Sequence, residues 1–413
     1  MKAVALFKNS SFFTFKSKHK GRKAMARNRK KAVRVDYAII FLMMLLCTIG
    51  LMAIYVAGLV NDQYTNNFLL QQSIWIVIST GIVVVIVLFF DYDRLQWAAY
   101  YLYGIGNLLL VLVLIVGDER KGSKSWISIG SLGSLQPSEL MKSFLILALA
   151  KVIWDHNKKY QLHTVKLDMQ LLLKIGIVSI VPLGLVGLQP DLGTILVFIA
   201  IIIGMVFISG VTWKILVPVF SSVALLGGTL IYLVMYNQDF LQKLGFKPYQ
   251  FKRITSWLRP EEDPLGDGMQ LLRSMQAIGS GQLQGNGIGN QAIAIPENHN
   301  DFIFSIIGGN FGFIGGCVLI MLYFLLIYQI IRVALDIGIP FYSYICTGVC
   351  SMILFHVLEN IGMTIGLLPI TGIPLLFVSY GGSSLLGAFM ALGLVLSARY
   401  NAPEVNLGKG NRV

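Results

Sequence analysis

A short polar cluster stands directly before a long apolar run. The stretch reads ENHNDFIFSIIGG over residues 297–309, and it contains the ionisable residues Glu297, His299 and Asp301. A carboxylate at such a border can take a proton as a general base or hold a divalent cation. It can also merely cap the start of a helix. Residue types alone favour the cap for Asp301, and they do not choose between its two chemical roles.

A second cluster, KGSKSWISIGSLGSLQPSELMK, covers residues 121–142. Its Gly and Ser residues predict a loop that dips into the membrane interface, and Pro137 suits the start of a helix. Glu139 and Lys142 are spaced i, i+3, so they can pair on one helix face. The plain alternative is that Trp126 is an interfacial anchor and that the Glu–Lys pair is only structural.

Two further stretches place polar groups at membrane depth, where ionisable residues are costly and usually functional. In LQPDLGT (188–194), Asp191 either caps the next helix or faces a site. In LENIGMTIGLLPITGIPLLFVSYGGSSLLG (358–387), Glu359 lies in an apolar run that prolines and glycines then interrupt. Broken helices at this depth are tolerated where they are buried in protein or line a cavity. The sequence therefore predicts an intramembrane cavity.

The long polar segment 237–300 contains cations and a short amphipathic stretch at 269–290 that predicts a helix followed by a Gly-rich turn. Arg253 in this segment and Lys124 in the earlier one, together with Lys121 and Arg259, are candidates for contacts with diphosphates or lipid head groups. Any solvated loop also carries such charges. GSGQLQGNGIG is not a dinucleotide fingerprint, because no strand precedes it.

The elements that must position these residues are membrane helices. The chain has 413 residues, of which 55% are apolar and only 13% charged, so a soluble globular protein is excluded. Apolar runs of about 20 residues can cross a bilayer. The sequence predicts an all-α, polytopic membrane protein of about ten transmembrane helices, with a large extracellular loop between helices 7 and 8. The predicted spans are 37–59, 70–90, 96–116, 136–154, 171–188, 191–210, 212–236, 301–331, 341–366 and 372–398.

The ends of the chain indicate its orientation. Residues 1–36 contain twelve Lys or Arg and one acid, without the apolar core of a signal peptide. The positive-inside rule places this basic tail in the cytoplasm, where anionic lipid is its expected partner rather than nucleic acid. Ten spans then place the tail 401–413 in the cytoplasm as well.

Several motifs together resemble one family. PENHNDFIFSIIGGNFGFIG, GSKSWISIGSLGSLQPSE, QPDLGT, AIGSG and NIGMTIGLLPITGIPLLFVSYGGSS occur in the order and spacing of the SEDS family (shape, elongation, division and sporulation). The likeness covers about residues 36–400, hence a domain at 37–400, and favours the elongation type, RodA, over the division type, FtsW. One departure is that Gly309 and Asn310 stand where the family commonly has two acids.

This resemblance implies a peptidoglycan glycosyltransferase of the bacterial cytoplasmic membrane. Such enzymes polymerise lipid II at the outer face, release undecaprenyl diphosphate, and work with a class B penicillin-binding protein. By motif, Asp301 is the essential aspartate and Trp126 the important loop tryptophan. Glu139, Lys142 and Asp191 also occupy family positions.

Glycosyl transfer from a diphosphate suggests roles for Asp301 and His299. Asp301 would act as general base, or would hold Mg²⁺ or Mn²⁺ against the diphosphate, and no cofactor is certain. His299 could orient Asp301 by a hydrogen bond, although a solvated loop histidine is an equal alternative. Two rival functions remain: a lipid II flippase or other transporter, which would carry polar residues through its full depth, and a non-catalytic cell-wall scaffold, which would tolerate loss of Asp301.

Overall fold

The computed structural model describes residues 35–60, 67–120, 123–128, 130, 134–160, 164–243, 251–263, 266–290, 293 and 295–401. The basic tail expected over 1–36 therefore falls almost wholly outside the described residues. Lys121 and the C-terminal tail from 402 onward lie outside them as well.

Helices make up most of the described chain, which confirms the all-α prediction. Ten helices in the described residues have 17 residues or more. They are α2 (Tyr37–Val60), α3 (Asn67–Phe89), α4 (Tyr92–Val116), α5 (Pro137–Lys159), α6 (Val165–Gly187), α7 (Leu192–Ile208), α8 (Trp213–Tyr236), α12 (Ile303–Ile337), α13 (Pro340–Thr364) and α14 (Gly382–Asn401). Eight of these are long and apolar enough to cross a membrane by length and composition. The other two are the charged α5 and the short α7.

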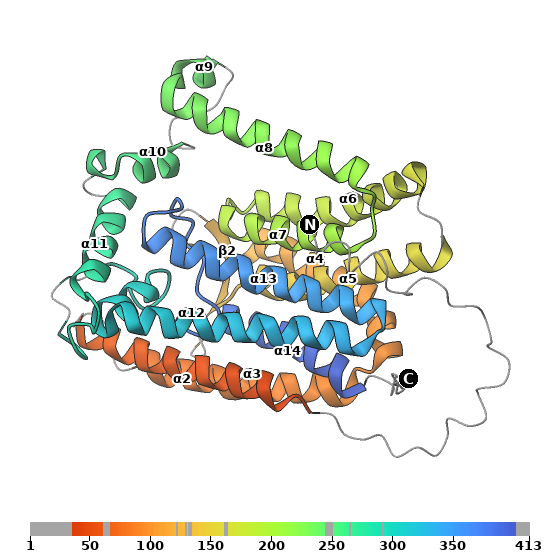
Figure 1. Cartoon of the computed structure of the whole chain (residues 1–413), viewed down its shortest axis with the longest axis horizontal. Helices are drawn as coiled ribbons and strands as arrows, with labels where there is room; N and C mark the ends of the chain where they lie inside the picture. Colours follow the sequence, from red (N-terminus) through yellow and green to blue (C-terminus); the bar gives the residue numbers. More distant parts are fainter. Residues whose placement is uncertain are drawn as a thin grey trace, which may run out of the picture. The chain divides into compact units, whose positions relative to one another are not determined.

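The bundle is built around α5, α13 and α14, whose side chains are mostly buried. Helix α13 packs against α5, α7, α12 and α14, and α14 also packs against α3 (Figure 1). Because side chains of all three helices are covered by other helices, these helices can carry polar groups that lipid would not tolerate. They are the framework of the site.

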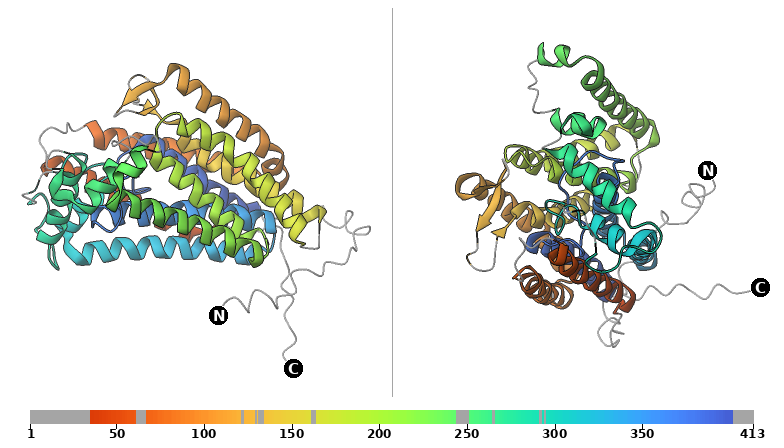
Figure 2. Two further views of the ribbon diagram at one scale, coloured as in Figure 1. Left: turned by 90° about the horizontal axis from the view of Figure 1, so that it is seen from above. Right: turned by 90° about the vertical axis from the view of Figure 1, so that its left-hand side faces the viewer.

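Helix α8 is the opposite case. It lies at the edge of the described helices in Figure 1 and again in the right-hand view of Figure 2. Ile215 and Leu216 near its start and Val234 near its end are buried, whereas the described residues of 217–232 are exposed or half-buried. Lipid tails are as apolar as these side chains, so an exposed surface of this kind is expected in a bilayer.

The last predicted span needs correction. The sequence predicts a span over 372–398, but α14 begins at Gly382 and residues 365–381 follow a non-helical path. Prolines in this segment lack an N–H, and Gly366 and Gly372 take positive φ angles of 78° and 75°. The freed backbone groups find protein partners, as when Gln72 Nε2 donates to the Ser379 carbonyl at 3.1 Å. Such a segment is tolerated at membrane depth.

The predicted interfacial loop at 121–142 is also partly wrong, because it contains a small antiparallel sheet. The strands β1 (Asp118–Arg120), β2 (Ser123–Ser128) and β3 (Ser134–Leu135) pair in that order. Trp126 lies opposite Asp118 in this sheet. The frequent Gly and Ser residues suggested a loop, whereas the strands pair through their backbones and Ser125 of β2 is buried. The expected helix start at Pro137 is confirmed, since α5 begins there.

The long segment between α8 and α12 contains α9 (Gln238–Lys243), α10 (Lys252–Leu258), the 3₁₀ turn η4 (Pro260–Glu262) and α11 (Asp267–Ser280). Helix α11 confirms the predicted amphipathic helix. The Gly-rich turn that follows packs against a break in α12 at Gly312, where φ is 66°. Asn310 fixes this turn, because its Oδ1 accepts from the Gly289 N–H at 3.0 Å. These contacts hold the start of α12 and, with it, the polar cluster at 297–301.

Candidate active site

A cavity of about 590 Å³ lies where the non-helical segment 365–381, the small sheet and the segment between α8 and α12 meet. Its walls come from the first turns of α3, α5, α7 and α14, from the β2–β3 region, from α10 and α13, and from the residues before α12. Seven of the residues singled out from the sequence line it: Trp126, Glu139, Lys142, Asp191, Arg253, His299 and Asp301. Residues far apart in the chain therefore share one cavity.

Asp301 lines this cavity at the end of the segment between α8 and α12. It stands one residue before the N-cap of α12, which is Phe302, so the N-cap interpretation of Asp301 is wrong by one position. Its backbone is fixed by Asn360 of α13, whose Nδ2 donates to the Asp301 carbonyl at 2.7 Å and to the Ile373 carbonyl at 2.9 Å. A methyl group added at Gly372 would come within 3.4 Å of Asp301 Oδ2, so the glycine leaves space beside the carboxylate.

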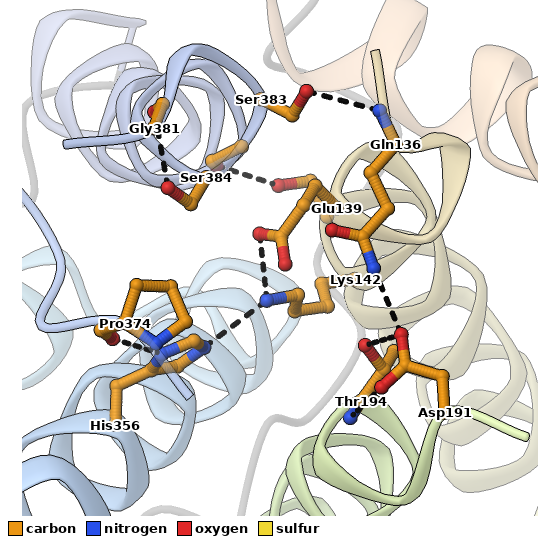
Figure 3. Close-up of polar contacts among 12 residues, drawn as sticks. Gln136, Glu139, Lys142, Asp191, Thr194, His356, Pro374, Gly381, Ser383 and Ser384 are labelled. Carbon is orange, nitrogen blue, oxygen red and sulfur yellow. Dashed lines mark hydrogen bonds and ion pairs between the residues drawn. The ribbon is translucent and has the colours of Figure 1, made fainter. Parts of the chain in front are cut away.

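Glu139 and Lys142 form the ion pair that their spacing predicts. Lys142 Nζ lies 2.7 Å from Glu139 Oε2, and both side chains are almost fully buried (1% and 6% exposed). On its other side, Lys142 Nζ lies 3.1 Å from Nε2 of His356 (Figure 3). The ammonium ion therefore lies between a carboxylate and an imidazole. A buried charge needs such partners, because leaving it without them would cost several kcal/mol.

His356 was not among the site residues predicted from sequence. Its Nδ1 lies 3.0 Å from the Pro374 carbonyl, which can only accept a hydrogen bond. The imidazole must therefore carry its proton on Nδ1, and this leaves the lone pair of Nε2 to accept from Lys142. The available signal was an ionisable residue inside an apolar span. Its partner, 214 positions earlier in the chain, had no signal of its own.

Asp191 caps α7, as the plain interpretation predicted. Its Oδ1 accepts from the Thr194 N–H at 3.0 Å, and its Oδ2 accepts from the Thr194 hydroxyl at 2.8 Å. The same Oδ2 accepts from Gln136 Nε2 at 2.8 Å, which joins the start of α7 to the N-cap of α5. Asp191 thus fixes two walls of the cavity while its side chain faces it (Figure 3).

Two further side chains of the segment between α8 and α12, Arg253 and His299, line the cavity. Arg253 of α10 donates to the Thr371 carbonyl at 3.3 Å and lines the cavity beside the non-helical segment. His299 stacks on Phe68, with ring centroids 4.9 Å apart and planes 10° from parallel. Tyr380 lies tilted against both rings, at 4.7 Å from Phe68 and 5.6 Å from His299. This aromatic group, which the sequence did not reveal, forms one wall of the cavity.

The structure does not bring Lys124 to the cavity. Its Nζ donates to the Ile115 carbonyl at 3.0 Å, and the residue is absent from the cavity wall. Arg259 also points elsewhere, because it pairs with Glu262 on the exposed loop at 3.2 Å. The phosphate contacts proposed from sequence for these two cations therefore have no geometric support. Among the described residues, Lys142 and Arg253 are the Lys and Arg side chains that line the cavity.

The carboxylates of the cavity do not form a metal cage. Among the described residues, no group of three or more His, Cys, Asp or Glu side chains is placed to hold a metal ion. A divalent cation at Asp301 would therefore need further ligands from a bound molecule or from water. Mg²⁺ commonly binds in this way, with one or two carboxylates and substrate phosphates as ligands.

Comparison with known proteins gives a consistent result. A family model named for FtsW, RodA and SpoVE and described as "Cell cycle protein" matches residues 37–404. Stage V sporulation protein E of Bacillus subtilis is 37% identical over 90% of this chain and 99% of its own length. Peptidoglycan glycosyltransferase RodA of Treponema pallidum is 32% identical over 88% of this chain and 96% of its own.

A solved structure agrees with these sequence matches. It is described as "Structural coordination of polymerization and crosslinking by a peptidoglycan synthase complex". One of its chains is similar with a TM-score of 0.69 and 30% identity, over 88% of this chain and 97% of that one. The matches include proteins named for sporulation and for RodA, so they confirm the family without choosing a type within it.

Proposed function

The chain belongs to the FtsW/RodA/SpoVE (SEDS) family, and we propose on this basis that it is a peptidoglycan glycosyltransferase. It polymerises lipid II into glycan strands at the outer face of the bacterial cytoplasmic membrane and releases undecaprenyl diphosphate. Its role is in cell elongation and shape maintenance. Both termini lie in the cytoplasm, where the basic tail 1–36 binds anionic lipid.

The observation that supports this proposal best is the presence of a carboxylate and two cations in one cavity. Asp301 stands just before α12, Lys142 is in the second turn of α5, and Arg253 is in α10; all three line the cavity. A glycosyl transfer from a lipid diphosphate needs a group that removes a proton and charges that stabilise the leaving diphosphate. The lining of this cavity supplies both.

The reaction assigns a role to each group. The acceptor sugar hydroxyl attacks the anomeric carbon of the donor, and its proton passes to the Asp301 carboxylate. The bond between the anomeric carbon and the diphosphate oxygen breaks, and its electron pair leaves with the diphosphate. Lys142 and Arg253 stabilise the negative charge that develops there. A general base of this kind is worth roughly 10²- to 10⁴-fold in rate.

A divalent cation is the alternative role for Asp301. In that case the carboxylate and the substrate phosphates share Mg²⁺ or Mn²⁺, and the metal neutralises the leaving group. The two roles differ in a measurable way. A general base gives a rate that rises with pH through the pKa of Asp301, whereas a metal site gives a rate that depends on added cation and falls with a chelator.

The partner that we propose is a class B penicillin-binding protein that cross-links the glycan product. The support is the similarity to a chain from a structure described as a peptidoglycan synthase complex. The protein should therefore be assayed in complex with that transpeptidase, with the transpeptidase active site blocked by a β-lactam, so that only polymerisation is measured.

The experiment compares lipid II polymerisation by the wild type and by Asp301→Ala. Glu262→Gln is the matched control, because Glu262 is an acid of the same outer loop that is 68% exposed and pairs only with Arg259. We expect glycan ladders from the wild type and the control, and none from Asp301→Ala. Equal ladders from all three would show that Asp301 is not catalytic. A wild-type complex that is folded but makes no ladder would contradict polymerisation and would favour lipid II transport.

A further inference from the structure

His356 occupies a position that the proposed reaction does not yet use. It lies in α13, is fully buried, and lines the cavity beside Lys142. Its two ring nitrogens face different parts of the protein: Nδ1 faces the Pro374 carbonyl, and Nε2 faces Lys142 Nζ. Since the carbonyl accepts the Nδ1 proton, Nε2 has no proton of its own and acts as an acceptor.

The ammonium group of Lys142 has three N–H donors. One is directed to Glu139, at 2.7 Å, and a second to His356, at 3.1 Å. Two fixed acceptors determine the orientation of a tetrahedral ammonium group, so the third N–H keeps a single direction. Lys142 lines the cavity, and this third donor is available to an anion bound there.

The Pro374 carbonyl links this arrangement to the other side of the cavity. It belongs to residues 371–374 of the non-helical segment 365–381. Asn360, which lies in α13 like His356, donates to the Ile373 carbonyl of this segment at 2.9 Å. Asn360 also holds the Asp301 carbonyl at 2.7 Å. His356 and Asn360 are four positions apart and therefore lie on one face of α13. This helix face thus fixes the positions of Lys142 and Asp301 relative to the same segment.

We propose that His356 is a positioning residue that holds the ammonium group of Lys142 toward the diphosphate of the substrate, while Asn360 of the same helix holds the backbone of Asp301. The inference rests on the proposed function, because it places the diphosphate of the substrate beside Lys142. Without His356, the ammonium group keeps its ion pair with Glu139 but can rotate about that contact. A misplacement of about 1 Å can reduce a rate roughly 10²-fold.

The chain offers a matched control. His156 near the end of α5 is also a buried histidine beside a lysine, with its Nδ1 3.4 Å from Lys174 Nζ. It lies 17 positions after Glu139 on the same helix, which corresponds to about 25 Å at 1.5 Å per residue. Replacing either histidine with leucine makes the same chemical change, but only His356→Leu affects the cavity.

The first measurement is steady-state polymerisation of lipid II by the complex with its transpeptidase. We expect His356→Leu to reduce kcat by roughly 30- to 100-fold with little change in KM, because the lost orientation matters most as charge develops. His356→Gln should recover most of this loss, since an amide can donate to Pro374 and accept from Lys142. His156→Leu should stay within about twofold of the wild type, as expected for a change away from the cavity.

The second measurement does not depend on turnover. It compares the affinity for undecaprenyl diphosphate, measured by fluorescence titration, in four proteins: wild type, His356→Leu, Glu139→Gln/Lys142→Met, and the triple variant. The double background removes the ion pair as a unit, so that no buried charge is left alone. If His356 acts through Lys142, His356→Leu weakens binding in the wild-type background and adds almost nothing in the double background.

Each outcome has a definite meaning. Equal losses of kcat in His356→Leu and His156→Leu would overturn the proposal. It would also be overturned if His356→Leu weakened the binding of undecaprenyl diphosphate equally in the wild type and in Glu139→Gln/Lys142→Met. Ladders from the wild type with full activity in His356→Leu would overturn it while the proposed function stands. A folded wild-type complex that makes no ladders and does not bind the diphosphate would overturn both.

Discussion

Helices α5 and α8 show opposite relations between composition and position. Helix α5 contains acids and lysines, yet most of its side chains are buried, including the ion pair of Glu139 and Lys142. Helix α8 is apolar along its length, yet its middle is exposed. In water the more polar helix would lie outside. In a bilayer, lipid solvates the apolar helix and protein must enclose the polar one.

This difference indicates how function can be located in such a protein. Helix α8 has the length and composition of a membrane span, whereas α5 contains an apolar run but also more charged residues than such a span usually has. The cavity, however, is lined by the first turns of α5 and not by α8. The charged residues of α5 therefore mark one wall of the cavity, because ionisable groups at membrane depth are costly and usually functional.

The strongest test of this comparison is the buried charge of α5. Lys142→Met leaves Glu139 buried without its cation, and we expect a loss of roughly 3–5 kcal/mol in unfolding free energy together with loss of polymerisation. Thermal unfolding in detergent and the glycan ladder assay measure the two effects. Glu139→Gln/Lys142→Met should recover most of the stability but no activity. A Lys142→Met protein as stable as the wild type would show that the pair is solvated rather than buried.

The sequence predicted what local patterns determine. Apolar run length located the ten long helices, eight of which qualify as membrane spans, although the last begins ten residues later than predicted. The i, i+3 spacing predicted the Glu139–Lys142 pair, and Asp191 was correctly expected to cap a helix. Assigning the cap of α12 to Asp301 failed by one residue, because the tight turn before Phe302 sets the start of that helix. Local patterns gave the element types more reliably than their ends.

The remainder depends on contacts between distant parts of the chain. His356 meets Lys142 only because α5 and α13 pack together, and the two residues are 214 positions apart. The non-helical path of 365–381 depends on partners such as Gln72, which lies in α3. Lys124 was chosen as a cation near a polar motif, but its position in β2 directs it to the Ile115 carbonyl. No periodicity in the sequence carries this information.

A second, smaller loss of stability is expected where Asp191 joins the start of α7 to the start of α5. Asp191→Ala removes the cap of α7 and the acceptor of Gln136, and we expect a loss of about 1–2 kcal/mol in unfolding free energy. Asp191→Asn should lose less, because the amide oxygen can still cap the helix. Thermal unfolding of the two variants beside the wild type measures this difference. Identical losses would mean that the carboxylate charge, rather than the cap, is what matters.

The loop that follows α8 should respond to pH through Asp263. Burial raises the pKa of this carboxyl group, but hydrogen bonds from Ser256 and the Gly268 N–H and the charge of Lys252 outweigh it, so the net pKa is lowered. A lowered pKa in the folded state stabilises the protein above the ordinary pKa of aspartate, and this stability is lost as pH falls through the folded value.

Asp263→Asn tests that linkage. We expect the wild type to lose roughly 1 kcal/mol more than the variant between neutral and acidic pH, because the ionised form makes the stronger hydrogen bonds. Hydrogen exchange of the segment 252–263 as a function of pH measures the local effect. If both proteins show the same pH dependence there, Asp263 does not stabilise the loop in its ionised form.

The smallest effect is expected on α8 itself. Leu225 lies in the exposed middle of that helix, 72% exposed, and Leu225→Ala should change the unfolding free energy by no more than about 0.5 kcal/mol. Leu145→Ala is the matched change in α5, where the side chain is fully buried, and it should cost about 2–5 kcal/mol. Thermal unfolding of both variants in the same detergent makes the comparison direct. A large loss in Leu225→Ala would mean that α8 packs against protein in the membrane, and the contrast between the two helices would then disappear.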